Sequence, residues 1–471
     1  MKQETFDIII IGAGSGGLNI ASFMNKAGFT VLLIDKNDEN IGGDCLNFGC
    51  VPSKALIHLA RCAHDARHTQ NIGLDVVGNV DIRRAMRYVK SKQEKIRKHE
   101  NAEYLRKQGM RVELGIAAFT GKNSVEINGR EFHGKKIVIA TGSHPRPLTT
   151  PGVEKVKYYT NQTIFDIDHL PERFIFIGGG PISLELCQCF QRFGSHVSVI
   201  QRRDTFLPRE IHEVTALLHK KLSDEGITFH YNTTPVEFIS PNELVVERKD
   251  GTKETLPFDA IFAGVGRDIN IAGLALEKAD IALDETGKHI KVDEYLRTTN
   301  KNVVLCGDVT GKYLFTHAAE LHAAVILNNF FNIFKKKLSY DMLSWVTYTD
   351  PEIATFGLRE KELEERGLTY KKLELNFDAD DRHIVDDTPH GKLILFVRKE
   401  KILGGSMVSP HAGELFQELA LAMTAGIKLK TFLNKIYPYP TATRVNKKII
   451  GNYFSRKLTP LTKKILRMVY R

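Results

Sequence analysis

The sequence predicts an α/β protein in which two similar strand–helix–strand units precede a mixed α+β segment. Each unit starts with a continuous apolar strand, at residues 7–11 and 174–177, which leads through a glycine-rich turn into a helix. Such a turn between strand and helix is typical of a Rossmann-like nucleotide-binding domain. Between the two units, the charged stretch 81–108 predicts one long helix with a solvated outer face. The later segment has strands such as 392–397 and a helix at 412–425 without a nucleotide signature. The 471 residues are enough for about three domains with full hydrophobic cores.

The first unit carries the fingerprint of a dinucleotide site. Gly12, Gly14 and Gly17 form the pattern GxGxxG directly after the first strand. The glycines permit a tight turn and close approach of the backbone to a pyrophosphate, and the helix N-terminus attracts its negative charge. Asp35 ends the next strand, where it is placed to bind ribose hydroxyls. Strand, turn, helix and terminal acid together predict a bound dinucleotide.

The second unit repeats this arrangement with two differences. Gly178 and Gly180 begin the turn, but Ser183 stands at the third small position. At the end of the second strand, Arg202 and Arg203 occupy the place where the first unit has an acid. Arginines there suit a 2′-phosphate, which favours NADPH over NADH, unless both side chains are simply solvated. Two dinucleotide sites in one chain imply electron transfer between two nucleotides.

Two cysteines separated by four residues follow the first unit. Cys45 and Cys50 come after a Gly-Gly pair and open a helix-like run at 54–60. Cysteines this close can join in a small, strained ring, whose disulfide is easier to reduce than a structural one. A helix start beside them stabilises thiolate. The pair predicts a redox-active disulfide; the alternative, two buried thiols, leaves the glycines and Lys54 unexplained.

Composition and charge exclude several classes of protein. Six cysteines in so long a chain exclude a disulfide-stapled secreted scaffold. The N-terminus has no signal-peptide pattern and no apolar run is long enough to span a membrane, so we expect a cytoplasmic protein. The formal net charge is +10, but residues 444–471 contain nine Lys or Arg and no acid, which leaves the body close to neutral. A nucleic-acid surface is therefore not expected.

Taken together, these motifs resemble the flavin-dependent class I pyridine nucleotide–disulfide oxidoreductases, which include dihydrolipoamide dehydrogenase, glutathione reductase and mercuric reductase. The resemblance covers almost the whole chain. Beyond the fingerprints and the cysteine pair, it rests on the segments Val51-Pro-Ser-Lys54, Ala140-Thr141-Gly142, Val265-Gly266-Arg267, Gly307-Asp308 and Tyr348-Thr-Asp350-Pro-Glu-Ile-Ala354.

The resemblance implies two Rossmann-like domains and a C-terminal α+β dimerisation domain. Residues 1–150 and 272–342 would form the FAD-binding domain, 151–271 the NAD(P)H-binding domain, and 343–471 the dimerisation domain with its basic tail. The expected cofactors are FAD and NADPH or NADH, and the expected assembly is a homodimer. Electrons would pass through the flavin to the Cys45–Cys50 disulfide and on to a small-molecule acceptor: a disulfide, a metal ion or a quinone.

The resemblance also implies roles for individual residues. Asp35 would bind the adenosine ribose of FAD, and Asp308 the chain that links its two halves. Cys50 would be the charge-transfer thiol that receives electrons, and Cys45 the interchange thiol that attacks the substrate. Further cofactor-binding residues implied by the family motifs are Gly12, Gly14, Gly17, Gly43, Thr141, Gly142, Gly178, Gly180, Arg202, Arg203, Gly266, Arg267 and Gly307.

A lysine–glutamate pair would complete the flavin site. Lys54 resembles the family lysine beside the reactive flavin nitrogen, held by Glu185. A fixed cation stabilises negative charge on reduced flavin, and a carboxylate keeps the amine in place. The alternative is an ordinary salt bridge between helices. We expect no bound metal: His64 and His68 lie one helical turn apart, but no third ligand accompanies them.

The chain departs from the disulfide-reducing members near its end. Their His-Pro-Thr segment and following Glu are replaced by Tyr439-Pro-Thr441 and Arg444. An unperturbed tyrosine has a pKa of about 10 and exchanges protons poorly near neutrality. Thiol–disulfide exchange needs a proton shuttle, whereas electron delivery to a metal ion or quinone need not. A dihydrolipoamide dehydrogenase, with Tyr439 or substrate groups managing the proton, is the alternative.

Features of the mercuric reductase branch are mixed. The tyrosine and the segment Pro410-His-Ala-Gly-Glu414 resemble that branch, but its paired C-terminal cysteines and its N-terminal metal-binding domain are missing. The tail, residues 457–471, has apolar residues at helical spacing beside a basic face. It is expected either to contact an anionic membrane or an acidic partner, or to pack on its own dimer. A tail-tethered interaction protein with secondary flavin chemistry is thus a further alternative.

Overall fold

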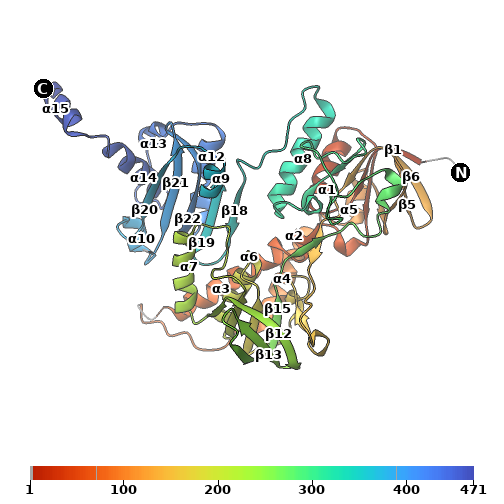
Figure 1. The fold of residues 1–471 in the computed structure, drawn as a ribbon, viewed down its shortest axis with the longest axis horizontal. Coiled ribbons are helices and arrows are strands. Elements are labelled where there is room, and N and C mark those ends of the chain that lie inside the picture. The colour runs from red at the N-terminus through yellow and green to blue at the C-terminus, as the bar shows by residue number, and fades with distance from the viewer. Residues whose placement is uncertain (1–3, 70–71, 389, 471) are drawn as a thin grey trace. The chain divides into compact units, whose positions relative to one another are not determined.

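The computed structural model describes residues 4–69, 72–388 and 390–470 and confirms the α/β class. The chain divides into two units (Figure 1). Unit 1 comprises 1–178, 192–200 and 233–338, and unit 2 comprises 179–191, 201–232 and 339–471. These units are compact parts of the structure, whereas the expected domain boundaries come from the family resemblance. Those boundaries stay a prediction. Within the described ranges, no helix has both the length and the apolarity needed to cross a bilayer.

The first strand–helix–strand unit forms the centre of the large sheet in unit 1. Strand β1 (Glu4–Ile11) pairs in parallel with β2 (Val31–Asp35) and β6 (Arg130–Ile139), and α1 (Ser15–Lys26) joins β1 to β2. Both faces are covered, so the strands read as continuous apolar runs. The sheet order is β3-β2-β1-β6-β5-β4 with β17 beside β6; the added strands are β3 (Arg111–Leu114), β4 (Ala118–Gly121), β5 (Ser124–Ile127) and β17 (Val303–Leu305).

The charged stretch near 81–108, which reads as one helix, is two helices. Helix α4 spans Ile82–Arg97 and α5 spans Ala102–Lys107. Asp81 Oδ1 accepts the backbone N–H of the third helical residue of α4, at 3.1 Å, and Asn101 Oδ1 does the same for α5, at 2.8 Å. Each side chain is an N-cap that satisfies an unpaired donor. The expectation of a single long helix is therefore wrong, because Asn101 starts a second one.

The second nucleotide-type turn follows β9 (Arg173–Ile177), which pairs in parallel with β10 (His196–Gln201) and β15 (Ala260–Ala263). Helix α6 (Pro181–Phe193) begins after the turn. The cysteine pair lies on two further helices, α2 (Gly43–Asn47) and α3 (Cys50–Arg67). Other elements of unit 1 are β7 (Ser143–Pro145), β8 (Tyr158–Tyr159), β12 (Thr233–Ser240), β13 (Glu243–Arg248), β14 (Lys253–Pro257), β16 (Arg267–Ile269) and α8 (Thr316–Phe331).

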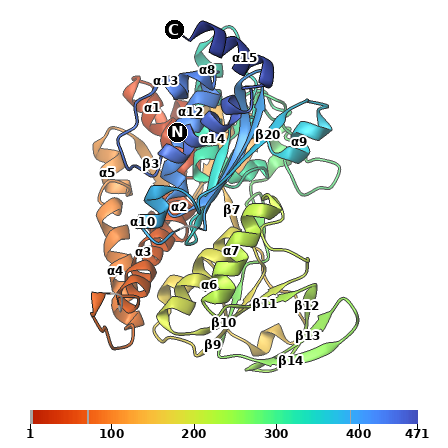
Figure 2. The same cartoon turned by 90° about the vertical axis from the view of Figure 1, so that its left-hand side faces the viewer.

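Unit 2 is built on an antiparallel sheet in the order β18-β19-β22-β21-β20. The strands are β18 (Ser344–Thr347), β19 (Glu352–Gly357), β20 (Lys371–Asn376), β21 (Lys392–Arg398) and β22 (Lys401–Ser409). Figure 2 shows the later helices beside this sheet. The helices are α7 (His212–Asp224), α9 (Glu360–Glu365), α10 (Asp381–Val385), α11 (Ala412–Leu415), α12 (Gln417–Thr424), α13 (Lys430–Asn434), α14 (Arg444–Ser455) and α15 (Pro460–Val469); β11 spans Thr228–Tyr231.

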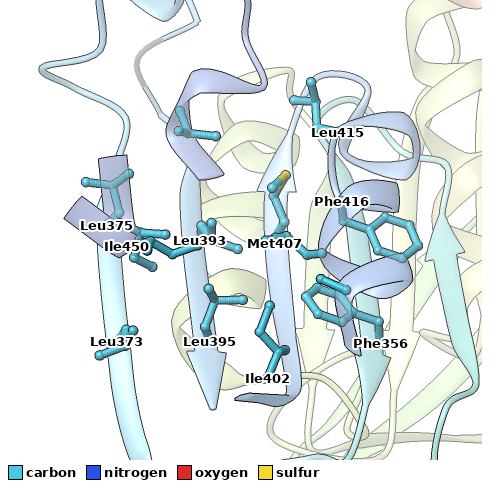
Figure 3. Close-up of a cluster of buried hydrophobic side chains, with 14 of the residues drawn as sticks. Phe356, Leu373, Leu375, Leu393, Leu395, Ile402, Met407, Leu415, Phe416 and Ile450 are labelled. Carbon is cyan, nitrogen blue, oxygen red and sulfur yellow. The ribbon is translucent and has the colours of Figure 1, made fainter. Parts of the chain in front are cut away.

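One face of this sheet carries the core of unit 2 (Figure 3). Leu373, Leu393 and Leu395 from β20 and β21 are 5% exposed or less, and Phe356 of β19 stacks on Phe416 with 5.2 Å between ring centroids. Ile450 of α14 belongs to the same cluster. Burying each of these large apolar side chains removes it from water and contributes about 2 kcal/mol.

Candidate functional site

The first glycine turn is shaped so that backbone atoms touch. Gly12 has a φ of +110°, and a Cβ there would lie 2.2 Å from the carbonyl oxygen of Ala140. A Cβ on Gly17 would lie 1.9 Å from the oxygen of Gly12. Any side chain at either place would displace backbone. The turn therefore leaves its backbone open at the start of α1, as pyrophosphate binding requires.

Asp35 holds this turn against the end of β2. Its Oδ2 accepts the N–H of Ala13 at 2.7 Å, and its Oδ1 accepts the side-chain N–H of Asn40 at 2.7 Å. The residue is 7% exposed. Asp35 thus orders the glycine turn through its bond to Ala13. Its place at the end of β2 is also compatible with binding a ribose. Its contact with ribose remains a prediction.

The cysteine segment lies directly over the first turn. Gly43 has a φ of +62°, and a Cβ there would lie 2.7 Å from the Cα of Gly14. The two backbones can approach this closely because both residues are glycine. A ligand held by the first turn would therefore be next to the segment that carries Cys45.

The two cysteines lie on successive helices. Cys45 is inside α2, and Cys50 is the first residue of α3, where the helix dipole favours thiolate. Cys50 Sγ lies 3.6 Å from the hydroxyl of Thr316, the first residue of α8. The pKa of Cys45 is raised, first by its hydrogen bond with Cys50 and then by burial. The raised pKa of Cys45 favours its protonated thiol form.

A polar network joins the cysteine segment to the turn at Asp308. Arg267 Nη2 lies 3.1 Å from Asp44 Oδ1, and Arg267 Nε lies 4.0 Å from Asp308 Oδ2. Ser143 donates to Asp308 Oδ2 at 2.7 Å. Burial raises the pKa of Asp308, and Ser143 and Arg267 oppose that shift. Arg267 thus neutralises two carboxylates that would otherwise repel each other, one of them beside Cys45.

The turn after β6 is fixed by an amide. Thr141 donates to the carbonyl of Asn270 at 2.6 Å, and Asn270 Nδ2 donates to the carbonyl of Thr141 at 2.8 Å. Gly142 follows with a φ of +71°. The sequence singles out Thr141 and Gly142 but not Asn270 or Ser143. Ser143 is 165 residues from its partner Asp308, and Asn270 is 129 residues from its partner Thr141. No local sequence pattern therefore marks either residue.

The second glycine turn has the same construction as the first. A Cβ on Gly178, whose φ is +104°, would lie 2.4 Å from the carbonyl oxygen of Gly264, while a Cβ on Gly180 would meet open space. Gly266, two residues later, has a φ of +121°. Within unit 2, the hydroxyl of Ser183 on α6 is buried and has no hydrogen-bond partner among the described residues. The close approach of Gly178 to Gly264 is of the kind that a dinucleotide-binding turn needs.

Arg202 and Arg203 follow β10 and are exposed. Gln201 folds back instead, donating from Nε2 to the carbonyl of Thr205 at 2.9 Å. The backbone carbonyl of Arg203 accepts the N–H of Asn232 at 3.0 Å. This bond fixes the backbone of the loop and leaves both guanidinium groups in solvent, available to a 2′-phosphate.

Glu185 and Lys54 belong to different units, and their pairing remains a prediction. Within unit 2, Glu185 of α6 is 5% exposed, and its Oε1 accepts the backbone N–H of Tyr348 at 2.9 Å. Gln188, one turn further along, makes a similar bond to the backbone of Asp350 at 2.8 Å. The carboxylate is thus held rigidly before any pairing with the lysine.

Tyr439 is exposed and hydrogen-bonded to a carboxylate. Its hydroxyl donates to Asp381 Oδ2 at 3.2 Å, and the guanidinium of Arg444 lies 5.3 Å from its ring centre. The pKa of Tyr439 is raised, chiefly by the hydrogen bond to Asp381. Its proton is therefore held more firmly than in a free tyrosine, further from the range in which a histidine works.

A group of metal-ligand side chains occurs elsewhere in unit 2. Glu352, His411 and Glu414 offer ligand atoms within 4.8 Å of one another. Glu352 Oε2, however, accepts the N–H of Gly413 at 2.9 Å, so the buried carboxylate anchors the turn into α11. This hydrogen bond explains the position of Glu352 without a bound cation. The expectation that no metal is bound stays a prediction.

Comparison with known proteins identifies the family. Residues 6–323 match the family described as pyridine nucleotide-disulphide oxidoreductase, and residues 343–449 match its dimerisation domain. The chain is 31% identical to a dihydrolipoyl dehydrogenase of Thermus scotoductus, over 93% of this chain and 95% of that one. It is 29% identical to a mercuric reductase of Lysinibacillus sphaericus, over 94% of this chain and 81% of the relative.

A solved structure of a relative has the same fold. The HOCl-induced flavoprotein disulfide reductase RclA of Escherichia coli matches with a TM-score of 0.83 and 26% identity, over 94% of this chain and 99% of that chain. The dimerisation domain indicates a homodimer. FAD and a pyridine nucleotide are the cofactors of this family. The chain therefore belongs to the class I pyridine nucleotide–disulphide oxidoreductases and is an FAD-dependent disulfide oxidoreductase.

Proposed function

We propose that this enzyme oxidises NADPH and passes the electrons through Cys45 and Cys50 to a metal ion or a quinone. FAD, held by the first glycine turn next to the cysteine segment, would supply the redox chemistry that links the nicotinamide to the disulfide. The observation that carries the choice of acceptor is the bond between Tyr439 and Asp381. This bond raises the pKa of Tyr439, so that the phenol does not provide the near-neutral acid–base group that exchange with an external disulfide needs.

The chain's own residues divide the work at the cysteine pair. Reduction of the disulfide takes two electrons and one proton and gives one thiolate and one thiol. Cys50, at the start of α3, is the residue placed to carry the thiolate, and Cys45, with its raised pKa, the one placed to keep the proton. Re-forming the disulfide releases both electrons to two one-electron metal ions or to one quinone, which also takes two protons.

Substrate preference follows from charges near each site. Arg202 and Arg203 are exposed at the end of β10, and they support binding of the 2′-phosphate of NADPH. Arg267 sits between Asp44 and Asp308 and keeps the region beside Cys45 from becoming strongly negative. A cationic or neutral acceptor is compatible with this combination of one guanidinium and two carboxylates beside Cys45.

Relatives support both this proposal and one alternative. Solved structures of the E. coli RclA relative include a Cu(II) complex, and mercuric reductases are among the curated relatives, which favours a metal ion. Dihydrolipoyl dehydrogenases match at similar identity, so reduction of NAD by dihydrolipoamide is the alternative. It would require Tyr439, or the substrate itself, to move the proton.

An anaerobic panel of acceptors tests the proposal. Purified holoenzyme is mixed with NADPH or NADH and with lipoamide, glutathione disulfide, a soluble quinone or Cu(II). We expect turnover of quinone or Cu(II) to exceed lipoamide turnover by at least about 100-fold, the usual worth of a missing acid–base group. Lipoamide turnover equal to the best acceptor, in either direction, would replace the proposal with the alternative.

A further inference from the structure

The last described helix of the chain buries none of its residues against the other described residues. Helix α15 spans Pro460–Val469, and none of its residues is buried. Its start is well defined, because Thr459 caps it by accepting the N–H of Thr462 at 3.2 Å, and Pro460 occupies the first turn. In Figure 1 it lies at the end of the chain, beyond α14. No face of α15 is thus buried against the rest of the described chain.

The apolar side chains of α15 share one face. Leu461, Ile465, Met468 and Val469 recur at spacings of four, three and one, which places them on adjoining positions of a helix. Leu466 extends this face at its edge. Their exposed fractions are Leu461 68%, Ile465 47%, Leu466 53%, Met468 69% and Val469 69%. So continuous an apolar face on an exposed helix indicates a binding surface.

The opposite face carries the three basic residues of α15. Lys463, Lys464 and Arg467 fall on it, so that Lys464 borders the apolar face on the Met468 side and Lys463 borders it on the Leu466 side. Long basic side chains at both edges can lay their methylenes along an apolar layer while their charges reach outward. This arrangement is typical of helices that lie in the plane of an anionic membrane surface.

We propose that α15 docks on an anionic phospholipid bilayer, with its apolar face among the acyl chains and its lysines and arginine at the headgroups. Charge complementarity selects this occupant: no Asp or Glu occurs in residues 444–471. The helix also lies beyond the match to the dimerisation domain, which ends at residue 449. The site therefore lies outside the segment that the family's dimerisation domain matches.

The base of the helix is anchored to the core. Lys457 pairs with Glu400 at 2.6 Å, and its ammonium lies 4.8 Å from the centre of the Tyr453 ring. A short segment, 458–459, then separates this anchor from α15. Docking would consequently hold the enzyme at the bilayer, where a membrane-dissolved acceptor such as a quinone is concentrated. That last point depends on the proposed function; the docking itself does not.

Co-sedimentation of the full-length holoenzyme with vesicles tests the proposal. The vesicles are equal parts phosphatidylcholine and phosphatidylglycerol, and pure phosphatidylcholine vesicles serve as the uncharged reference. We expect binding to the anionic vesicles alone, weakened by added salt. The variant K463Q/K464Q/R467Q should lose on the order of 100-fold in partitioning, since each basic residue near an anionic surface adds several-fold. Ile465→Asp should lose about tenfold or more.

A matched control separates tail charge from total charge. The variant R87Q/K95Q/K98Q removes three exposed positive charges from the region of α4 and should bind as the wild type does. All variants should keep the NADPH-dependent reduction of a soluble dye and the mass of the homodimer. Absence of binding to anionic vesicles, or equal losses in both triple variants, would overturn the proposal. So would a change of oligomeric mass in the tail variants, which would assign the face to a second copy.

Discussion

Arg267 and Asp44 form an ion pair, with 3.1 Å between Nη2 and Oδ1, that ties the cysteine segment to the turn at Asp308. The side chain of Arg267 is 12% exposed and that of Asp44 is 33% exposed. Asn161 adds a bond to Asp44 at 3.2 Å. The residue just before Cys45 is therefore fixed from two directions, which positions the thiol relative to the first glycine turn.

Removing Arg267 should loosen this region. Arg267→Met leaves Asp44 and Asp308 without their shared cation, and we expect a loss of about 2 kcal/mol in the free energy of unfolding, together with weaker retention of FAD. Urea unfolding and released flavin fluorescence measure both. Arg146→Met is the control, since its pair with Asp268 is exposed on both sides and worth little. Equal effects of the two substitutions would show that the central position of Arg267 is unimportant.

Gly43 and Gly28 distinguish backbone strain from steric contact. Both have positive φ, at +62° and +86°, but a Cβ on Gly43 would meet Gly14 Cα at 2.7 Å, while a Cβ on Gly28 would meet nothing within 4 Å. Gly28→Ala should cost about 1 kcal/mol from φ alone. Gly43→Ala should cost clearly more and reduce FAD content. If both variants lose the same stability and keep their flavin, the close approach of the two backbones has no role.

His322 should make the stability of unit 1 depend on pH. It is fully buried, its Nδ1 accepts the N–H of Gly307 at 3.1 Å, and burial lowers its pKa to about 4. Between the ordinary pKa of about 6.5 and this lowered value, the unfolded chain binds a proton that the folded chain refuses. Stability is therefore full above that window and falls as pH decreases through it.

The size of this effect can be measured against a variant. From about pH 7 to about pH 5 the contribution of His322 should fall by about 2 kcal/mol. Thermal or urea unfolding of the wild type and of His322→Asn over this range gives the difference. A parallel pH profile for the two proteins would mean that His322 is charged in the folded state, contrary to its buried position beside the Asp308 turn.

Restoring the family's acid–base pair should bring back disulfide chemistry. Tyr439→His with Arg444→Glu replaces a phenol of raised pKa by an imidazole that titrates near neutrality. We expect lipoamide turnover to rise by about 100-fold or more. Asp381→Asn is the matched control, because it lowers the pKa of Tyr439 without supplying a histidine. No gain in the double variant would mean that the proton is handled elsewhere.

Local motifs could be predicted from the sequence, and distant partnerships could not. Gly12, Gly178 and Cys50 lie where their motifs place them, because each depends on a strand or helix a few residues away. The partners Ser143 and Asn270 were missed, since strands β7 and β16 bring them to the site from distant parts of the chain. The division between α4 and α5 was missed because a charged helix pattern outweighed one capping residue, Asn101.

The roles of Lys54 and Glu185 illustrate a second limit. Each matches a family motif, yet the two residues belong to different units, so their pairing depends on how the units meet. Within unit 2, Glu185 is already bonded to the backbone of Tyr348. Neither helical periodicity nor motif spacing predicts the hydrogen bond between Glu185 and the backbone of Tyr348. The sequence thus supplies the chemistry of the pair, and its geometry needs measurement in the holoenzyme.

Anaerobic titration of the holoenzyme with NADPH tests most directly whether electrons leave through the cysteine pair. One equivalent should generate two thiols that react with a thiol reagent, together with a long-wavelength absorbance band that Cys50→Ser abolishes. Acceptor turnover should disappear in the variant Cys45→Ser/Cys50→Ser. A reduced enzyme without new thiols, or a double variant that keeps full turnover, would contradict the account.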